Sequence, residues 1–160
     1  LIKSAGRAAG ARSKIAVASE DERIDPVGAC VGHRGARVQA VGAELYDEKI
    51  DIVRWSENIS QFVAEALSPA KSVKVRANDD KQSCLVLVPD NMLSLAIGKS
   101  GQNVRLAARL TGWRIDIRSE SQEAKAAFAK AAEEVEAEER EASMDSALLA
   151  TDDASTLPTD

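Results

Sequence analysis

The chain has 160 residues, 44% of them hydrophobic, which is enough to bury a core in one ordinary domain or in two small ones. That content excludes disorder throughout, and no apolar run approaches the roughly 18 residues that a transmembrane helix needs. No charged and then apolar segment opens the chain as a signal peptide would. We therefore expect a soluble protein that is neither secreted nor inserted in a membrane.

The net charge of −5 is the average of two parts with opposite signs. Residues 1–120 hold 18 Lys and Arg against 15 Asp and Glu, a balance of +3. Residues 121–160 hold 3 against 11, a balance of −8. A mildly basic body suits a polyanion, and an acidic tail suits either a basic partner or the basic surface of its own chain.

The first part of the chain contains the signals of short strands and short helices. Ser13–Ser19 alternates and includes β-branched Ile15 and Val17, which favours a strand. Asp25-Pro26 supplies a helix cap and a first-turn proline. The predicted elements are a strand at 2–5, a strand at 13–19, a helix at 26–31, a helix at 36–45 and a strand at 49–53.

A second set of elements begins at Ser56. The helix predicted at 56–67 has a continuous apolar face and closes at Ser68-Pro69. Ser119 and Gln122 form a capping box for a helix that runs to about Met144, and 151–160 is expected to be disordered. Between them we predict a strand at 73–76, a strand at 83–88, a short helix ending at 97, a helix at 102–110 and a strand at 113–117.

The two sets of elements are copies of each other. Gly32 aligns with Gly98, Gly35 with Gly101, and Ile50-Asp51-Ile52 with Ile115-Asp116-Ile117. A repeat of about 65 residues with this content indicates two copies of one small domain. The alignment also assigns 2–5 to a strand, and it places the counterpart of helix 56–67 upstream of Leu1. Asp51 and Asp116 are expected to face outward between core isoleucines, rather than to act as a carboxylate pair.

Each copy carries a Gly-x-x-Gly turn between two apolar helices. Glycine has no Cβ, so a sugar-phosphate chain can lie against such a turn, and the next helix presents its amides to phosphate. A single Gly-x-x-Gly is more often a helix C-cap, but two in matching surroundings favour a binding loop. Gly98-Lys99-Ser100 resembles the end of a P-loop, yet that motif requires glycine where Leu93 stands. Nucleotide hydrolysis is therefore not expected.

Other candidate sites are weak. His33, the only histidine, has no partner at ligand spacing, so we expect an exposed loop residue. Cys30 and Cys84 are far apart without zinc spacing, and both are expected to be small core residues. We predict no catalytic residue, no metal site and no cofactor. Trp55 is expected to pack, with an interface between the two copies as a second interpretation.

The order strand, strand, helix, Gly-x-x-Gly, helix, strand resembles the type II, prokaryotic KH domain. The strings DPVGACVGHRGARVQAV, EKIDIV, ALSPAK and LSLAIGKSGQNVRLAARLTGWRIDI resemble the tandem KH region of the NusA family of bacterial transcription termination and antitermination factors. The resemblance implies an α+β fold: two tandem KH domains, each a three-stranded mixed sheet with helices on one face, followed by an acidic helical to disordered tail. The implied boundaries are 1–54, 55–120 and 121–160.

The resemblance also implies a function. It implies non-catalytic binding of single-stranded RNA, the nascent transcript, by a monomer in the bacterial cytoplasm. The implied partners are RNA polymerase, through the full-length protein, and other Nus factors. An alternative in another class is a ribosome- or RNase-associated KH scaffold. The residues that we expect to bind RNA are Gly32, His33, Arg34, Gly35, Arg37, Gly98, Lys99, Ser100, Gly101, Gln102, Asn103 and Arg105.

Overall fold

The computed structural model describes residues 1–72 and 74–152. Val73, predicted in a strand, and 153–160, predicted to be disordered, lie outside this described part. The chain divides into two compact units, one formed by Leu1–Glu120 and the other beginning at Ser121. Because the first unit contains both Gly-x-x-Gly turns, it holds the expected binding region.

The first half of this unit is a three-stranded mixed sheet with two helices. β1 and β2 pair antiparallel with Ala5 opposite Ile15, and β2 and β3 pair parallel with Ile15 opposite Ile52. Both helices pack against β3. The elements are β1 (Ile2–Ala8), β2 (Arg12–Val17), α1 (Pro26–Val31), α2 (Ala36–Glu44) and β3 (Lys49–Arg54).

The second half repeats this topology and adds a helix at its start. Val75 lies opposite Val86 in the antiparallel pair, and Val86 lies opposite Ile117 in the parallel pair. The sequence alignment therefore holds at the level of strand register. The elements are α3 (Ile59–Ala66), β4 (Lys74–Asn78), β5 (Ser83–Val88), α4 (Leu93–Ile97), α5 (Gln102–Thr111) and β6 (Arg114–Ser119).

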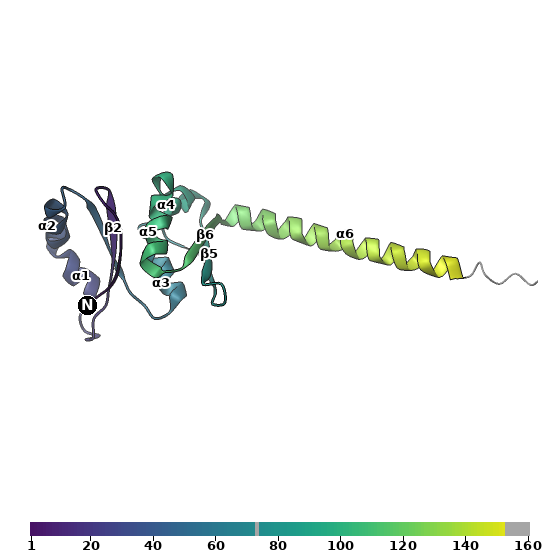
Figure 1. The fold of residues 1–160 in the computed structure, drawn as a ribbon, viewed down its shortest axis with the longest axis horizontal. Coiled ribbons are helices and arrows are strands. Elements are labelled where there is room, and N and C mark those ends of the chain that lie inside the picture. The colour runs from purple at the N-terminus through teal and green to yellow at the C-terminus, as the bar shows by residue number, and fades with distance from the viewer. Residues whose placement is uncertain (73, 153–160) are drawn as a thin grey trace, which may run out of the picture. The chain divides into compact units, whose positions relative to one another are not determined.

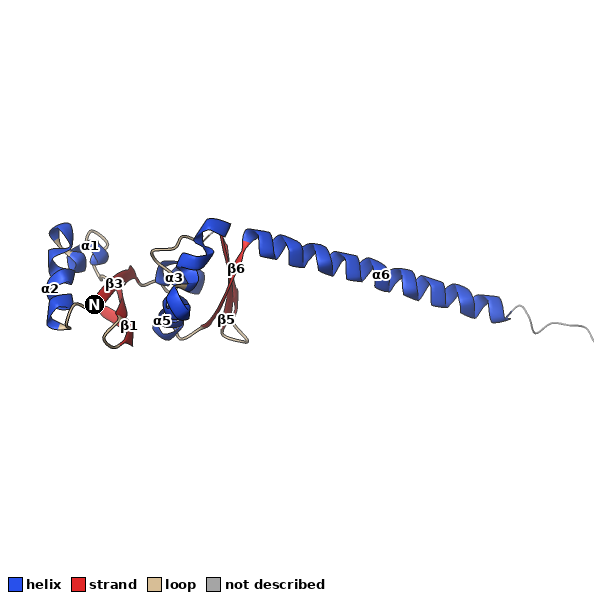
Figure 2. Ribbon diagram, turned by 90° about the horizontal axis from the view of Figure 1, so that it is seen from above, coloured by secondary structure: helices blue, strands red, loops and turns tan. Residues whose placement is uncertain are grey.

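The layers alternate between helices and sheets. In Figures 1 and 2, α1 and α2 cover one side of the first sheet, while α3 and α5 lie between the two sheets. Ala16 and Val53 of the first sheet belong to the same buried cluster as Phe62 and Val63 of α3. The expected pair of three-stranded mixed sheets with helices is confirmed. In addition, the helices of the second domain cover the free face of the first sheet.

The first sheet approaches α5 closely. A Cβ on Gly6 would lie 2.9 Å from the carbonyl oxygen of Leu106, so the strand fits against the helix only without a side chain there. Nearby, the Ser4 hydroxyl donates to the carbonyl of Leu110 at 2.9 Å. These contacts join residues about a hundred positions apart, and they fix the first domain on the second.

A buried lysine completes this contact. The Lys14 side chain is 0% exposed, and its ammonium donates to the carbonyl of Ser68 at 2.7 Å and to Asp51 at 3.2 Å. Burial lowers the pKa of Lys14, and the nearby carboxylate of Asp51 opposes that shift. Asp51 also accepts two hydrogen bonds from Arg12, at 2.7 and 3.0 Å. The buried charge is therefore paired, as stability requires.

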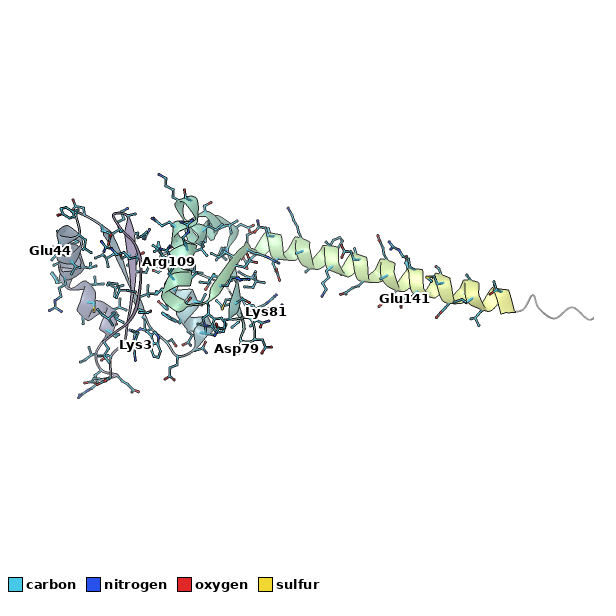
Figure 3. All side chains as sticks on the ribbon, in the orientation of Figure 1. Lys3, Glu44, Asp79, Lys81, Arg109 and Glu141 are labelled. Carbon is cyan, nitrogen blue, oxygen red and sulfur yellow. The ribbon has the colours of Figure 1, made fainter. Side chains whose placement is uncertain are left out.

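Trp55 lies at the contact between the domains, as its second interpretation proposed. Its ring meets Phe62 of α3 edge to face with centroids 6.5 Å apart, and the Lys3 ammonium lies 4.7 Å from the ring centroid. Beyond this pair, Arg109 of α5, labelled in Figure 3, donates to the carbonyl of Arg7 in β1 at 3.1 Å. The contact thus combines apolar packing with hydrogen bonds.

Two predictions about single residues were wrong. Asp51 was expected to face solvent, but its side chain is only 22% exposed because the second domain covers that face of the sheet. Its counterpart Asp116 is 63% exposed, as expected. Cys84 is buried as predicted, whereas Cys30 is exposed.

Some helix ends also differ from the prediction. α3 begins at Ile59 instead of Ser56, because the side chain of Asn58 accepts from the amide of Gln61 and acts as the cap. The tail helix α6 (Glu120–Asp152) starts directly after Ser119 but continues past Met144, so its predicted end was wrong. The apolar and small residues at 146–150 favour helix. No helix in the described ranges has the length and apolar character to cross a membrane.

Candidate nucleic-acid interface

The two Gly-x-x-Gly turns have the same backbone conformation. The first glycine has φ 77° and ψ 177° in Gly32, and φ 77° and ψ 170° in Gly98. This region is open essentially only to glycine. The third residue is left-handed in both turns, with φ 50° and ψ 30° in Arg34 and φ 56° and ψ 27° in Ser100. The repeat in sequence therefore produces two copies of one loop.

The first glycine of each loop is held against the helix that follows. A Cβ on Gly32 would lie 2.7 Å from Cγ of Arg37, and one on Gly98 would lie 2.8 Å from both Cβ and the backbone nitrogen of Asn103. No rotamer change moves a backbone atom. The first glycine is thus required because the turn packs against the following helix, and not because it leaves the backbone open to a ligand.

The second glycine of each loop has a different role. Gly35 and Gly101 also have positive φ, at 78° and 72°, but a Cβ there would meet nothing closer than 3.4 and 3.9 Å. Each precedes a helix whose N-terminus has no side-chain cap. The start of α2 and of α5 therefore has bare backbone without a side-chain cap, while the amides of Ala36 and Gln102 donate to the carbonyls of His33 and Lys99 within the turns. An anionic backbone can approach such a bare turn.

A side chain from the following helix braces each loop. Arg37 donates to the carbonyl of Ala29 at 2.7 Å, and Asn103 donates to the carbonyl of Ala96 at 2.9 Å. Asn103 also donates to the carbonyl of Leu67 at 3.1 Å, and its amide oxygen is buried with no hydrogen-bond partner in the part of the chain that the structure describes. Asn103 is 3% exposed, so it holds the helices around the loop.

The remaining loop side chains face solvent. His33, Arg34, Lys99 and Ser100 are all exposed, and the guanidinium of Arg105 donates to the carbonyl of Ser100 at 3.1 Å. The structure thus presents cationic side chains beside both bare turns. Within 1–72 and 74–152, no three His, Cys, Asp or Glu residues lie together as metal ligands would.

A groove beside the second loop includes residues that sequence reasoning did not find. Its volume is about 430 Å³, and Ala11, Arg12 and Lys49 of the first domain line it together with Gly98 and Lys99. No motif or spacing connects Lys49 with a loop fifty positions later. Only the packing of one domain on the other, through Gly6 and Lys14, brings them to the same groove.

Comparison with protein families matches both halves of the first unit. Residues 1–55 match the NusA-like first KH domain, and residues 59–125 match the NusA-like second KH domain. The two matches follow each other in the order that the repeat requires. They also meet at the linker before α3.

Three curated relatives share this region, and each is named transcription termination/antitermination protein NusA. The protein of Halalkalibacterium halodurans is 61% identical over 121 residues, which are 76% of this chain and 32% of the relative. The Bacillus subtilis protein is 58% identical over 120 residues, which are 75% of this chain and 32% of the relative. The Rickettsia conorii protein is 51% identical over 127 residues, which are 78% of this chain and 25% of the relative. This chain therefore spans a quarter to a third of the relatives' length.

Proposed function

Because the chain belongs to the NusA-like KH family, we propose that its two loops bind unpaired RNA during transcription termination and antitermination. KH domains hold about four nucleotides of a single strand along the Gly-x-x-Gly loop. The proposed domains are 1–54 and 55–120, with 121–160 as an acidic tail. The relatives' names favour this function over that of a ribosome- or RNase-associated scaffold.

The observation that carries the proposal is the shared conformation of the two loops. Both present an open second glycine and an uncapped helix start, beside exposed cations. Phosphates would lie on the turns, while Gln102 and the guanidinium of Arg105 would reach the strand. Arg37 and Asn103 would act mainly by positioning the loops. No step of this binding requires a cofactor or a catalytic residue.

Other properties belong to the whole protein. Since this chain spans a third or less of the relatives, association with RNA polymerase and with other Nus factors is proposed for the full-length protein. The same reasoning proposes a monomer in the bacterial cytoplasm. Co-purification of polymerase with the full-length protein would support these partners, and its failure under low salt would contradict them.

The direct test changes the loop interiors to Asp. The His33→Asp/Arg34→Asp variant and the Lys99→Asp/Ser100→Asp variant should each fold, because these side chains are exposed and Asp tolerates the left-handed backbone. We expect each pair to weaken RNA binding about tenfold or more, since charge-assisted phosphate contacts are lost and a negative charge is added. Fluorescence anisotropy with labelled single-stranded RNA measures the effect.

The chain offers a matched control at the turn between β4 and β5. Lys81 and Gln82 are exposed, and Gln82 has φ 45°, so this pair reproduces both the charge and the backbone of Lys99 and Ser100. The Lys81→Asp/Gln82→Asp variant should bind RNA nearly as the unmodified chain does. Equal binding by all folded variants would mean that the loops are not the RNA site.

A further inference from the structure

The groove beside the second loop has walls from both domains. Ala11, Arg12 and Lys49 of the first domain form one wall, and the loop residues Gly98 and Lys99 belong to the other. Its volume of about 430 Å³ is within the range of small-molecule and cofactor sites. The second KH domain alone would leave this side of its loop open.

Both walls are held in place by buried contacts. The ammonium of the fully buried Lys14 donates to the carbonyl of Ser68 and to the carboxylate of Asp51. That carboxylate also accepts from Nε and Nη2 of Arg12. The backbone amide of Lys49 donates to the carbonyl of Ala11 at 3.3 Å, which ties the two strands of the first-domain wall together. The groove is thus a property of the packed pair of domains.

The charges that line the groove are positive. Lys49 and Lys99 are exposed and form no ion pair within the described ranges, 1–72 and 74–152. No acidic residue is among the described residues that line the groove, and Asp51, the ion-pair partner of Arg12, is also paired with Lys14. Two unpaired ammonium groups, one from each domain, suit an anion that enters the groove.

The groove also contains apolar surface. Pro69 and Leu95 line it, and Leu95 is 45% exposed although it lies on the helix that leads into the loop. Ser94 and Gln102 add a hydroxyl and an amide that can exchange hydrogen bonds with a base edge. Phosphate-binding cations next to an apolar surface and polar groups match the chemistry of one unpaired nucleotide.

We infer that the first domain completes the RNA site of the second loop: one nucleotide occupies this groove, with its phosphate between Lys49 and Lys99. The inference rests on the proposed function, because the groove opens on the second Gly-x-x-Gly loop. An acidic peptide would also meet two cations there. The continuity with the loop favours RNA, since its strand would pass from the turn directly into the groove.

The test compares two lysines that carry the same charge. The Lys49→Ala variant and the Lys81→Ala variant are each titrated into a fluorescein-labelled pool of single-stranded RNA. Each RNA is about three times as long as the roughly four nucleotides that one KH domain holds. Lys49→Ala should weaken binding about threefold to tenfold and reduce the slope of log K against log salt by about 0.7, the value for one phosphate contact. Lys81→Ala should change neither quantity, and Lys49→Arg should restore the slope.

A second measurement locates the contact. One RNA sequence isolated from the pool is made with a single uncharged methylphosphonate at each position in turn. One position should weaken binding to the unmodified chain more than it weakens binding to Lys49→Ala, because Lys49 and that phosphate share a contact while the contact with Lys99 remains in the variant. Independent, additive effects at every position would overturn the inference, as would equal binding by the Lys49 and Lys81 variants.

The outcomes separate this inference from the proposed function. If both loop variants, His33→Asp/Arg34→Asp and Lys99→Asp/Ser100→Asp, bind RNA normally, the proposed function fails and this inference fails with it. If only the Lys99→Asp/Ser100→Asp variant binds normally, the first loop can still be the RNA site, but this inference fails. If that variant loses binding while Lys49→Ala does not, the loop is the site but the groove takes no nucleotide. If an acidic peptide competes for Lys49 and RNA does not, the groove serves a protein partner and the inference is wrong.

Discussion

At the scale of single residues, a buried carboxylate organises the end of the first sheet. The Glu48 side chain is 0% exposed and accepts from Arg7, from the backbone amide of Gly10 and from the Ser13 hydroxyl. The Ser13 hydrogen bond is the main reason that the pKa of Glu48 lies below its ordinary value of 4.5. The charged form of Glu48 is therefore the one that the fold stabilises.

The stability of the chain should consequently depend on Glu48 in acid. The stabilisation by Glu48 is complete above pH 4.5, the ordinary value, and is lost as the pH falls through the lower pKa of the folded state. We expect Glu48→Gln to lower the free energy of unfolding at pH 7 and to lower it much less in strong acid. Urea unfolding at several pH values measures this. A constant difference between the two proteins at all pH values would contradict it.

The two glycines of the second loop should respond differently to alanine. Gly98→Ala places a Cβ 2.8 Å from a backbone nitrogen in a conformation reserved for glycine, so we expect a loss of about 2–4 kcal/mol of stability. In Gly101→Ala the added Cβ comes no closer than 3.9 Å to Nη2 of Arg105, an ordinary contact, so the change should cost only about 1 kcal/mol, from its left-handed φ. Urea unfolding ranks the two variants. The Gly101 variant should still lose RNA affinity, because the added methyl group covers the bare turn.

At the scale of elements, the tail helix concentrates negative charge. α6 is 33 residues long, and most of the acidic residues of 121–160 lie within Glu133–Glu141. Lys130 with Glu134, and Arg140 with Glu136, form exposed pairs one turn apart. Such pairs contribute only a few tenths of a kcal/mol each, so ion pairing within the helix does not account for the surplus of glutamates.

The tail should compete with RNA for the basic body. A tethered acidic segment acts at a high effective concentration on cations in the same chain. Removing residues 121–160 should therefore raise RNA affinity at low salt, and the gain should disappear at high salt. A full-length variant with Gln at the six glutamates of 133–141 controls for the length of the helix. Unchanged affinity in both variants would contradict this role for the tail.

At the scale of the whole molecule, the two domains share one core. Ala16 and Val53 of the first sheet lie in the same cluster as the residues of α3 and α5. Lys14 spans the contact with its charge paired, and Gly6 allows the strand to approach the helix. A first domain separated from the second would expose this face of its sheet.

The domains should therefore unfold together. Trp55 lies at the contact and Trp113 lies within the second domain, so single-tryptophan variants, with Trp113→Phe or Trp55→Phe, report on the two places separately. We expect coincident urea transitions. Gly6→Leu should separate them by displacing β1 from α5, with the Trp55 signal changing first. Coincident transitions in the Gly6 variant would show that the contact tolerates the added side chain.

Sequence reasoning reached the repeat, the strand order and the two loops, because these are local signals. Glycines three positions apart and the Ile-Asp-Ile strings mark the same element wherever the domain packs. Local signals could not predict the burial of Lys14 and Asp51 or the place of Lys49 in the groove, because these depend on the contact between the domains. A lysine in a strand is ordinarily exposed, and the residues next to Lys14 in the sequence do not indicate that the carbonyl of Ser68 accepts a hydrogen bond from it.

Asn103 shows the same limit inside a motif. RNA binding by Asn103 stays a prediction from its place after the second loop; in the structure the side chain is buried and donates to the carbonyls of Ala96 and Leu67. Its counterpart Arg37 bonds a single carbonyl and remains exposed. The repeat aligned the two positions correctly, but the presence of α3 in the second domain gave one of them a role that the pattern did not contain.

The close seat of β1 on α5 has a consequence for the kind of RNA that this chain would distinguish. With Gly6 packed against Leu106, the two domains are held together, so under the proposed RNA binding the two turns would lie at a fixed separation along the RNA strand. Two short sequence elements would be read together only when the number of nucleotides between them matches that separation. An RNA with the same two sequence elements and one extra nucleotide between them would then bind more weakly.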